Sequence, residues 1–486
     1  MERALEPGPG GPAAPDVGAP LEVQAAFLQF TLSLYPGRLA YVDVILESTV
    51  ALLRKHAARA GDAGSRAGRL SGPSAERVVE LLSCPLKTLS LSVLELEHYP
   101  ALLGFLDFET RKQAALAMVG VVIEEDLTLG SVEAVSSLFA CITPLIKDEE
   151  DTPATEGSDR DAFVREQHQV CKLLYQVRSD DVDVVFQMHK AMLVFFGQGG
   201  PERLVHTLPP TFCAAMSLIP RVREGSRRRA DEGGEGPAPA VSAKKVFHFM
   251  HKANSQLAHS APDEALQLWL VAAAAADQME KLSGQGSFEP ICYEFLTQAL
   301  IVFEEQLTES NKQYQGIFKL VGTLTQIAFL ESDNFDNIGT RITQHAARLL
   351  KKPLQCRAVA SCSHLFWCEA RRDGKRVLEC MQKCLKVTDA LVQSDPKQVG
   401  LWVEMLDHYV YYYECQCEEV TIVYVQSLVN LCFEHIAYAE NDAQSVHDGA
   451  KARAHLNSSL AYLASLKASS KPDVAARFAE LSLDQP

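Results

Sequence analysis

The sequence predicts an all-α protein, a HEAT-like α-solenoid built from antiparallel helix pairs. Apolar residues recur at helical spacing in segment after segment, short loops marked by Pro, Gly or Asp separate the segments, and strand patterns are scarce. Helix following helix without a strong domain linker is typical of a solenoid. No strict sequence period is visible, which favours the degenerate HEAT class, with repeats of about 40 residues, over tetratricopeptide or ankyrin repeats.

The helices follow from this spacing in chain order. A first helix is expected from residue 21 to Pro36, because proline ends it, and a second from 38 to 60, where Leu39, Val42 and Ile45 share a face. Further helices are expected at 87–97, 101–105, 108–125, 131–146, 161–178, 181–196 and 209–222. The second half continues the plan at 243–258, 262–280, 288–307, 312–330, 333–351, 354–370, 374–393, 397–413, 418–438 and 447–466.

The solenoid is therefore expected to span residues 21–470. Residues 1–20, rich in Pro, Gly and Ala, are expected to form a disordered leader, and 471–486 a C-terminal tail. Flexible loops are expected near 61–74, 147–160 and 223–241, where Gly, Ser and charged residues replace the helical pattern.

Composition excludes several classes of function. The formal net charge of −16 argues against sequence-independent binding of nucleic acid, which needs a basic footprint, and disfavours adsorption to anionic lipid. No apolar run reaches the roughly 18 residues that span a bilayer, and no secretion signal starts the chain. Thirteen cysteines without a disulfide framework suit reduced thiols in the cytosol. We expect a cytoplasmic protein.

Catalytic and metal-binding signatures are weak. Cys356, Cys362, His364 and Cys368 are close in sequence, but on one helix Cys362 and His364 diverge, so no metal is expected. There is no Gly-x-Ser-x-Gly elbow, Walker loop or His-Glu-x-x-His motif. The sequence therefore predicts no enzyme, no cofactor and no metal.

Charge patterning offers two candidate surfaces. Arg348, Lys351 and Lys352 at i, i+3 and i+4 are expected to form a cationic face on the last turns of a helix, while Glu304 and Glu305 lie late in an earlier helix. Both are either ordinary solvated faces or a self-complementary contact between two copies of the chain.

Four sequence blocks resemble one family. They are ELEHYPALLGFLDFETRKQAALAMV (95–119), FFGQGGPERLVHTLPPTFCAAMSLI (195–219), KKPLQCRAVASCSHLFW (351–367) and GKRVLECMQKCLKVTDALV (374–392). They resemble, in the same order, the C-terminal half of the large helical subunit of retromer, the vacuolar protein sorting thirty-five family. The resemblance covers about 27–462 and leaves the leader unmatched.

The resemblance implies a non-enzymatic scaffold. It implies an α-solenoid whose C-terminal half holds a metallophosphoesterase-like subunit, in a coat that retrieves transmembrane cargo from endosomes to the Golgi or plasma membrane and pairs through the solenoid ends. The protein would be peripheral on the endosomal membrane, and cargo and coat adaptors would be reached indirectly. The family's Pro-Arg-Leu-Tyr-Leu signature for an arrestin-like subunit is absent. The chain is thus expected to be a fragment or a shortened gene product, and binding of that subunit is not carried over.

The matched block also supplies partner-binding candidates. His364 lies on a helical stripe with Arg357, Ser361 and Cys368, and we expect a partner contact through this stripe and Trp367. His364 as a buried core histidine remains the alternative reading. An unrelated HEAT-repeat scaffold or transport adaptor remains the alternative function.

Overall fold

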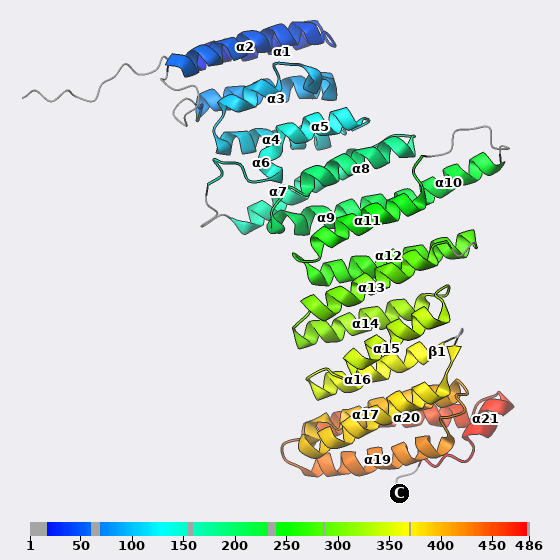
Figure 1. Ribbon diagram of the computed structural model, residues 1–486. Helices are drawn as coiled ribbons and strands as arrows, with labels where there is room; N and C mark the ends of the chain where they lie inside the picture. The colour runs from blue at the N-terminus through cyan, green and yellow to red at the C-terminus, as the bar shows by residue number, and fades with distance from the viewer. Residues whose placement is uncertain are drawn as a thin grey trace, which may run out of the picture. The chain divides into compact units, whose positions relative to one another are not determined.

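The computed structural model describes residues 17–59, 69–153, 159–231, 240–284, 287–368 and 371–483. These residues form helices α1 to α21, a few 3-10 turns and one two-stranded hairpin, which confirms the all-α fold class. The chain divides into two compact units, Met1–Ala261 and Pro262–Pro486. Within each unit the helices stack as successive antiparallel layers (Figure 1).

The first unit contains eleven α-helices in its described residues. They are α1 (Gly18–Leu34), α2 (Leu39–Arg59), α3 (Pro73–Leu89), α4 (Phe108–Glu124), α5 (Val132–Cys141), α6 (Thr143–Ile146), α7 (Arg160–Lys172), α8 (Val182–Phe196), α9 (Pro201–Met216), α10 (Leu218–Asp231) and α11 (Ala243–Leu257). The 3-10 turns between them are η2 (Ser90–Glu95), η3 (Pro100–Phe105) and η4 (Leu173–Gln176).

The second unit continues with ten helices and the hairpin among its described residues. They are α12 (Pro262–Ser283), α13 (Glu289–Gln306), α14 (Ser310–Gln326), α15 (Ser332–Ala346), α16 (Lys352–Ser363), η5 (His364–Phe366), β1 (Trp367–Cys368), β2 (Arg371–Arg372), α17 (Gly374–Ser394), η6 (Pro396–Gln398), α18 (Gly400–Glu414), α19 (Ile422–Asn441), α20 (Val446–Lys467) and α21 (Pro472–Phe478). The strands pair antiparallel, with Trp367 opposite Arg372.

Helix ends follow local chemistry. Asp107, Ser131, Asp181 and Ser242 each accept a hydrogen bond from a backbone N–H of the helix that follows, which satisfies a donor otherwise left unpaired at the N-terminus. Proline occupies the first turn of α9, α13, α16 and α21, where its missing N–H costs nothing.

Polar links in the second unit join some helices to the equivalent helix of the next repeat. In the odd-numbered row, Arg341 of α15 binds Glu304 of α13, 37 residues away. In the even-numbered row, Arg357 of α16 binds Glu404 of α18, 47 residues away. A repeat near 40 residues, expected from the class of solenoid, therefore appears as a spacing of contacts although the sequence shows no period.

Several boundaries differ from the sequence expectation. α1 begins at Gly18, inside the expected leader, and α10 continues to Asp231, so the first part of the expected loop 223–241 is helical. The expected tail contains α21, whose Phe478 is fully buried against the ring of Tyr413. Residues 1–16, 61–68, 154–158, 232–239 and 484–486 of the expected leader, loops and tail lie outside the described residues.

The expected loop at 147–160 is partly anchored. Arg111 of α4 donates 2.7 Å hydrogen bonds to both Glu149 and Asp151, and Arg69 also pairs with Asp151. Arg203 of α9 binds Asp148 at 2.8 Å. The acidic residues that suggested a solvated loop thus hold 148–151 against two helices.

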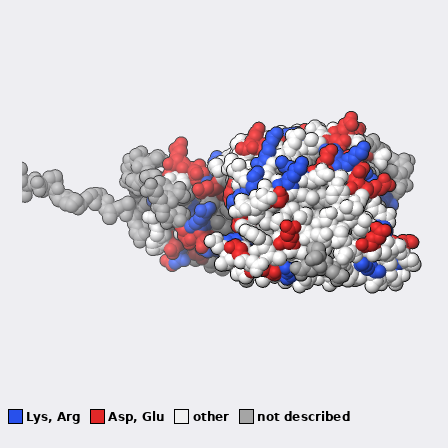
Figure 2. Space-filling model, turned by 90° about the horizontal axis from the view of Figure 1, so that it is seen from below, with Lys and Arg blue, Asp and Glu red and all other residues white. Residues whose placement is uncertain are grey.

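No helix in the described part of the chain is long and apolar enough to cross a membrane. On the face shown in Figure 2, Lys and Arg side chains are interspersed with Asp and Glu rather than gathered in one field. Interspersed charge of this kind gives that face no broad footprint for a polyanion.

Candidate partner-binding site

Pro353 determines where α16, the helix that carries the expected partner-binding residues, begins. α15 ends at Ala346, and α16 starts at Lys352, so that Pro353 stands in its first turn, where the missing N–H is tolerated. The turn between the helices is tied down by the buried Gln355, whose amide donates to the carbonyl of Ala347.

The expected cationic helix end is wrong. Arg348 lies in the turn after α15, Lys351 is the residue before α16, and Lys352 is its first residue, because Pro353 starts a new helix here. All three cations are exposed, and they do not complement a helix C-terminus. Leu350, in the same turn, is 82% exposed. Residues 348–352 form a protruding turn, which we call the cationic turn.

The two expected acidic residues differ in their surroundings. Glu304 of α13 accepts 2.8 and 2.9 Å hydrogen bonds from Arg341 and a 2.9 Å bond from His345. Partial burial raises the pKa of Glu304, but the bonds from Arg341 and His345 outweigh it and leave that pKa below its usual value. Glu305 is exposed. Glu304 is therefore already engaged within the chain.

The stripe expected on α16 forms only in part. Arg357, Ser361 and His364 follow one another along α16 and η5 at i, i+4 and i+7, which places them on one face. Trp367 and Cys368 leave this face because the helix expected over 354–370 ends early and β1 begins. Trp367 is 9% exposed and is covered by the Arg372 guanidinium, 4.9 Å from the ring centre.

Arginines stacked on aromatic rings hold the hairpin in place of the expected helix. The Arg371 guanidinium lies 3.4 Å from the Phe335 ring centre and that of Arg376 lies 3.9 Å from Phe366. Arg376 also donates to Asp336 at 3.0 Å. These cation–π contacts favour the extended backbone at 367–368 and 371–372 over another helical turn.

His364 packs among aromatic side chains of α18. Its ring centre lies 5.7 Å from that of His408, 5.2 Å from Tyr411 and 5.4 Å from Tyr412. Burial and, to a lesser extent, the neighbouring His408 lower the pKa of His364 to about 4. The imidazole is half-buried and neutral near neutral pH, while the neighbouring Tyr411 is 42% exposed.

This low pKa predicts a pH-dependent stability. An unfolded histidine takes up a proton near pH 6.5, whereas folded His364 resists protonation until about pH 4, so its contribution is present above 6.5 and is lost as the pH falls towards 4. We expect His364 to account for about 2 kcal/mol of lost unfolding free energy between about pH 6.5 and 5. Urea unfolding at both pH values should show a shallower dependence in His364→Asn. An unchanged dependence would contradict the assignment.

Arg357 is committed to the neighbouring repeat. Its guanidinium forms 2.8 and 2.7 Å hydrogen bonds to both carboxylate oxygens of Glu404, and this hydrogen bonding to Glu404 raises its pKa. The sequence did not predict Glu404, His408 and Tyr411 of α18, which contact the Arg357 and His364 side chains of the stripe. The aromatic run HYVYYY at 408–413 was the one local signal for them.

The cysteines suspected of binding metal face different neighbours. Cys356 lies against Cys384 of α17, Cys362 lies near Cys380, and Cys368 sits in β1. Burial raises the pKa of Cys380 to about 12, which keeps it a thiol. Within the described ranges, no group of three or more His, Cys, Asp or Glu is placed to hold a metal ion.

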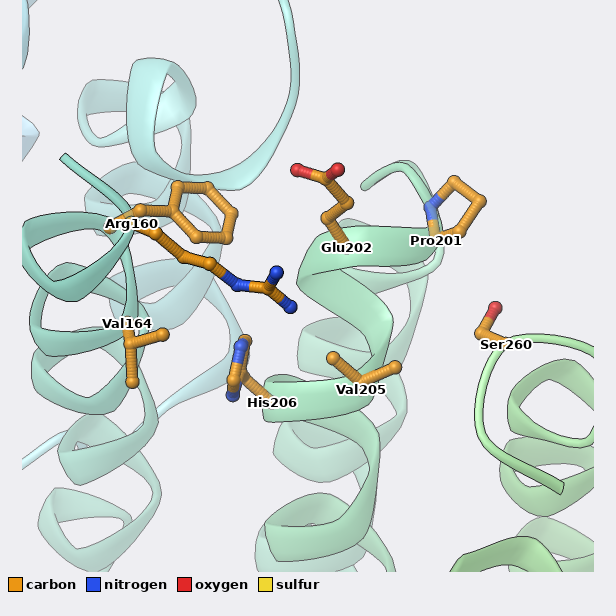
Figure 3. Close-up of a pocket in the computed structure, with 8 residues that line it drawn as sticks. Arg160, Val164, Pro201, Glu202, Val205, His206 and Ser260 are labelled. Atoms are coloured by element: carbon orange, nitrogen blue, oxygen red, sulfur yellow. The ribbon is translucent and has the colours of Figure 1, made fainter. Parts of the chain in front are cut away.

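A separate cavity of about 490 Å³ lies between α7 and α9 in the first unit (Figure 3). Arg160, Glu202 and His206 project towards it beside Val164 and Val205. Burial, His168 and Arg160 lower the pKa of His206, so it too is neutral near pH 7. Opposite charges and aliphatic groups line this cavity, an arrangement without a nucleophile and base in contact.

The fold and the site together define a class of protein, a helical-repeat scaffold that offers rows of side chains to partners. The sequence model of the family described as vacuolar protein sorting-associated protein 35 matches residues 16–435. The chain belongs to this family.

Individual relatives agree with this assignment. Vacuolar protein sorting-associated protein 35A of Arabidopsis thaliana is 34% identical over 422 residues, which cover 84% of this chain and 50% of the relative. Protein 35C of the same plant is 32% identical, over 90% of this chain and 53% of its own length. The Dictyostelium discoideum protein 35 is 27% identical, over 73% of this chain and 45% of its own length. This chain spans about half the length of these relatives.

Proposed function

We propose that this chain is a non-enzymatic scaffold subunit of a retromer coat. In this role it retrieves transmembrane cargo from endosomes to the Golgi or the plasma membrane. The observation that carries the proposal is the family match over 16–435, on a chain whose described residues form stacked helical repeats. Because the chain belongs to this family, the alternative of an unrelated HEAT-repeat scaffold is excluded.

The proposed partner of the second unit is a metallophosphoesterase-like subunit. We place it on Arg357, Ser361 and His364 of α16 and η5, with Tyr411 of α18 beside them. Half-buried aromatic and arginine side chains next to an exposed tyrosine have the composition of interface hot spots. Trp367, the fifth residue expected at this contact, is buried under Arg372 in β1 and is not part of the proposed face.

Attachment to the endosomal membrane would be peripheral and would depend on other coat subunits. Cargo and coat adaptors would then be reached indirectly.

Co-expression with the phosphoesterase-like subunit tests the proposal. The two chains should co-elute as one complex in size-exclusion chromatography, at a volume smaller than that of either chain alone. Separate elution at micromolar concentration would contradict the proposed function.

The proposed self-association uses the cationic turn. We infer that Arg348, Lys351 and Lys352, with Leu350 at their centre, meet an acidic face of a second copy, on which Glu305 and Glu304 are both exposed and Glu304 also binds Arg341. An exposed leucine surrounded by cations can make an apolar contact at the centre of the interface while the cations pair with carboxylates around it.

Reversing the three charges of the cationic turn to glutamate should weaken self-association by more than about tenfold and reduce its salt sensitivity. Sedimentation equilibrium at two ionic strengths measures both effects. The matched control reverses Lys55, Lys172 and Lys383, which are exposed elsewhere. An equal loss in the control, or no loss in the test variant, would leave the turn an ordinary solvated surface.

A further inference from the structure

A groove of about 970 Å³ lies between α8 and α11 in the first unit, and none of the residues of the proposed partner face lines it. The two helices approach each other at both ends. At one end, Asp183 accepts 2.8 Å hydrogen bonds from the backbone N–H groups of Ala240 and Val241. At the other end the helices are close but no bond joins them among the described contacts, and a Cβ added at Gly197 would lie 3.3 Å from the amide oxygen of Gln256.

The floor of the groove is apolar. Phe186 of α8 and Phe249 of α11 meet edge to face with ring centres 5.7 Å apart, and both are 5% exposed. Val194 lines the same groove and is 62% exposed. An exposed valine over a recessed aromatic floor is a surface that gains from being covered by another apolar group.

The rim of the groove is basic. Lys244, His248 and Lys252 follow one another at i, i+4 and i+8 along α11, so they form one stripe about 12 Å long. Lys190 of α8 faces them across the groove. Among the described residues that line the groove there are four lysines and no Asp or Glu, although the chain as a whole carries a net charge of −16.

The floor and the rim together specify one kind of ligand. We propose that the groove binds an acidic amphipathic α-helix of a partner protein. Its apolar face covers Val194 and the aromatic floor, and carboxylates that flank this apolar face pair with Lys190 and Lys252. Side chains four residues apart on a helix share a face, which matches the i, i+4, i+8 stripe of α11.

A peptide helix fits this groove better than a membrane surface. The floor residues Phe186 and Phe249 are recessed and 5% exposed, so a flat bilayer surface cannot reach them between the rims. A helix about 10 Å wide can lie along the groove and reach the floor with every third or fourth side chain.

The test uses the full chain and a synthetic probe. The probe is a fluorescein-labelled helical peptide of about 16 residues, with leucines on one face and glutamates flanking them at i, i+4 spacing. Fluorescence anisotropy should show saturable binding that weakens with salt. Lys190→Glu/Lys252→Glu should weaken it by more than about tenfold, and Val194→Asp should weaken it as well.

Two controls separate the groove from general charge. The variant Lys55→Glu/Lys383→Glu makes the same change in net charge at exposed sites elsewhere and should keep affinity within about twofold. A scrambled peptide of the same composition should not bind. Equal loss in the control variant, equal binding of the scrambled peptide, or no binding of the designed peptide would overturn the proposal. So would competition by anionic lipid vesicles that requires Lys190 and Lys252. Circular dichroism confirms that each variant is folded.

Discussion

Replacing His364 by arginine is expected to abolish co-elution with the phosphoesterase-like subunit. The longer, permanently charged side chain cannot share the space that the imidazole shares with His408, Tyr411 and Tyr412, so the guanidinium must move outward into the contact face. A displaced hot-spot residue costs at least about 2 kcal/mol, so affinity should fall by more than about thirtyfold. Size-exclusion chromatography of the co-expressed chains measures the loss.

A folding defect must be separated from loss of the interface. Tyr411→Glu changes a 42% exposed residue beside His364, so it should remove binding while leaving the helical circular dichroism and the thermal midpoint close to wild type. His259→Arg, at an exposed histidine of the first unit, is the matched control and should bind normally. If both Tyr411→Glu and His364→Arg bind as tightly as wild type, the partner does not use this face.

The second large effect is expected in the core of the second unit. Trp269 of α12 is 1% exposed and stacks on Phe295 of α13 with ring centres 5.6 Å apart. Trp269→Ala leaves a cavity between two helices that are joined by a short connection, and it should lower the unfolding free energy by about 3–5 kcal/mol. Urea unfolding followed by far-UV circular dichroism measures the change, because tryptophan fluorescence is itself altered.

Phe318→Ala provides the control for that experiment. Phe318 of α14 is 41% exposed, so removing its ring should cost less than about 1 kcal/mol. A comparable loss in both variants would mean that the stability of this unit does not depend on the α12–α13 core. Partner binding is a second readout, since a locally destabilised α12 should leave the face on α16 and α18 largely intact.

The repeat architecture could be predicted from the sequence because it rests on local signals. Apolar spacing gave the class of fold and most helices, including α4, α8 and α12, and Pro353 was recognised as a break. The helix α3 was missed and α9 was expected to start only at 209. Gly and Ser precede α3, and Pro209 and Pro210 lie inside α9. In both places these residues, which usually mark loops, outweighed the helical spacing of the apolar residues.

Other boundaries depend on contacts between distant residues. α21 is held by Phe478 and by Arg477, which donates to the carbonyls of Tyr413 and Glu414 more than 60 residues away. The pairing of 367–368 with 371–372 depends on Phe335, which Arg371 covers. The local sequence of a tail or a helix end does not show which residue of another repeat it contacts. These boundaries therefore become visible only in the folded structure.

The candidate site shows the same division. The sequence identified Arg357, Ser361 and His364 as one face, and the structure keeps them together. It did not show that Arg357 is bound by Glu404, or that His364 lies among the aromatic side chains of α18. The cationic turn was assigned to the wrong element because the end of α15, five residues before Lys351, leaves no proline or glycine signal.

The polar links between successive repeats also have a mechanical meaning. Two ion pairs, Arg341 with Glu304 and Arg357 with Glu404, each fix the distance between two helices of successive repeats. Within the second unit the repeats can therefore be treated as springs connected in series. The compliance of such a stack is the sum over its springs, and each link is partly exposed to solvent. Raising the ionic strength weakens each of these pairs at once, so a small loss of stiffness per repeat adds up to a larger bend over the whole unit.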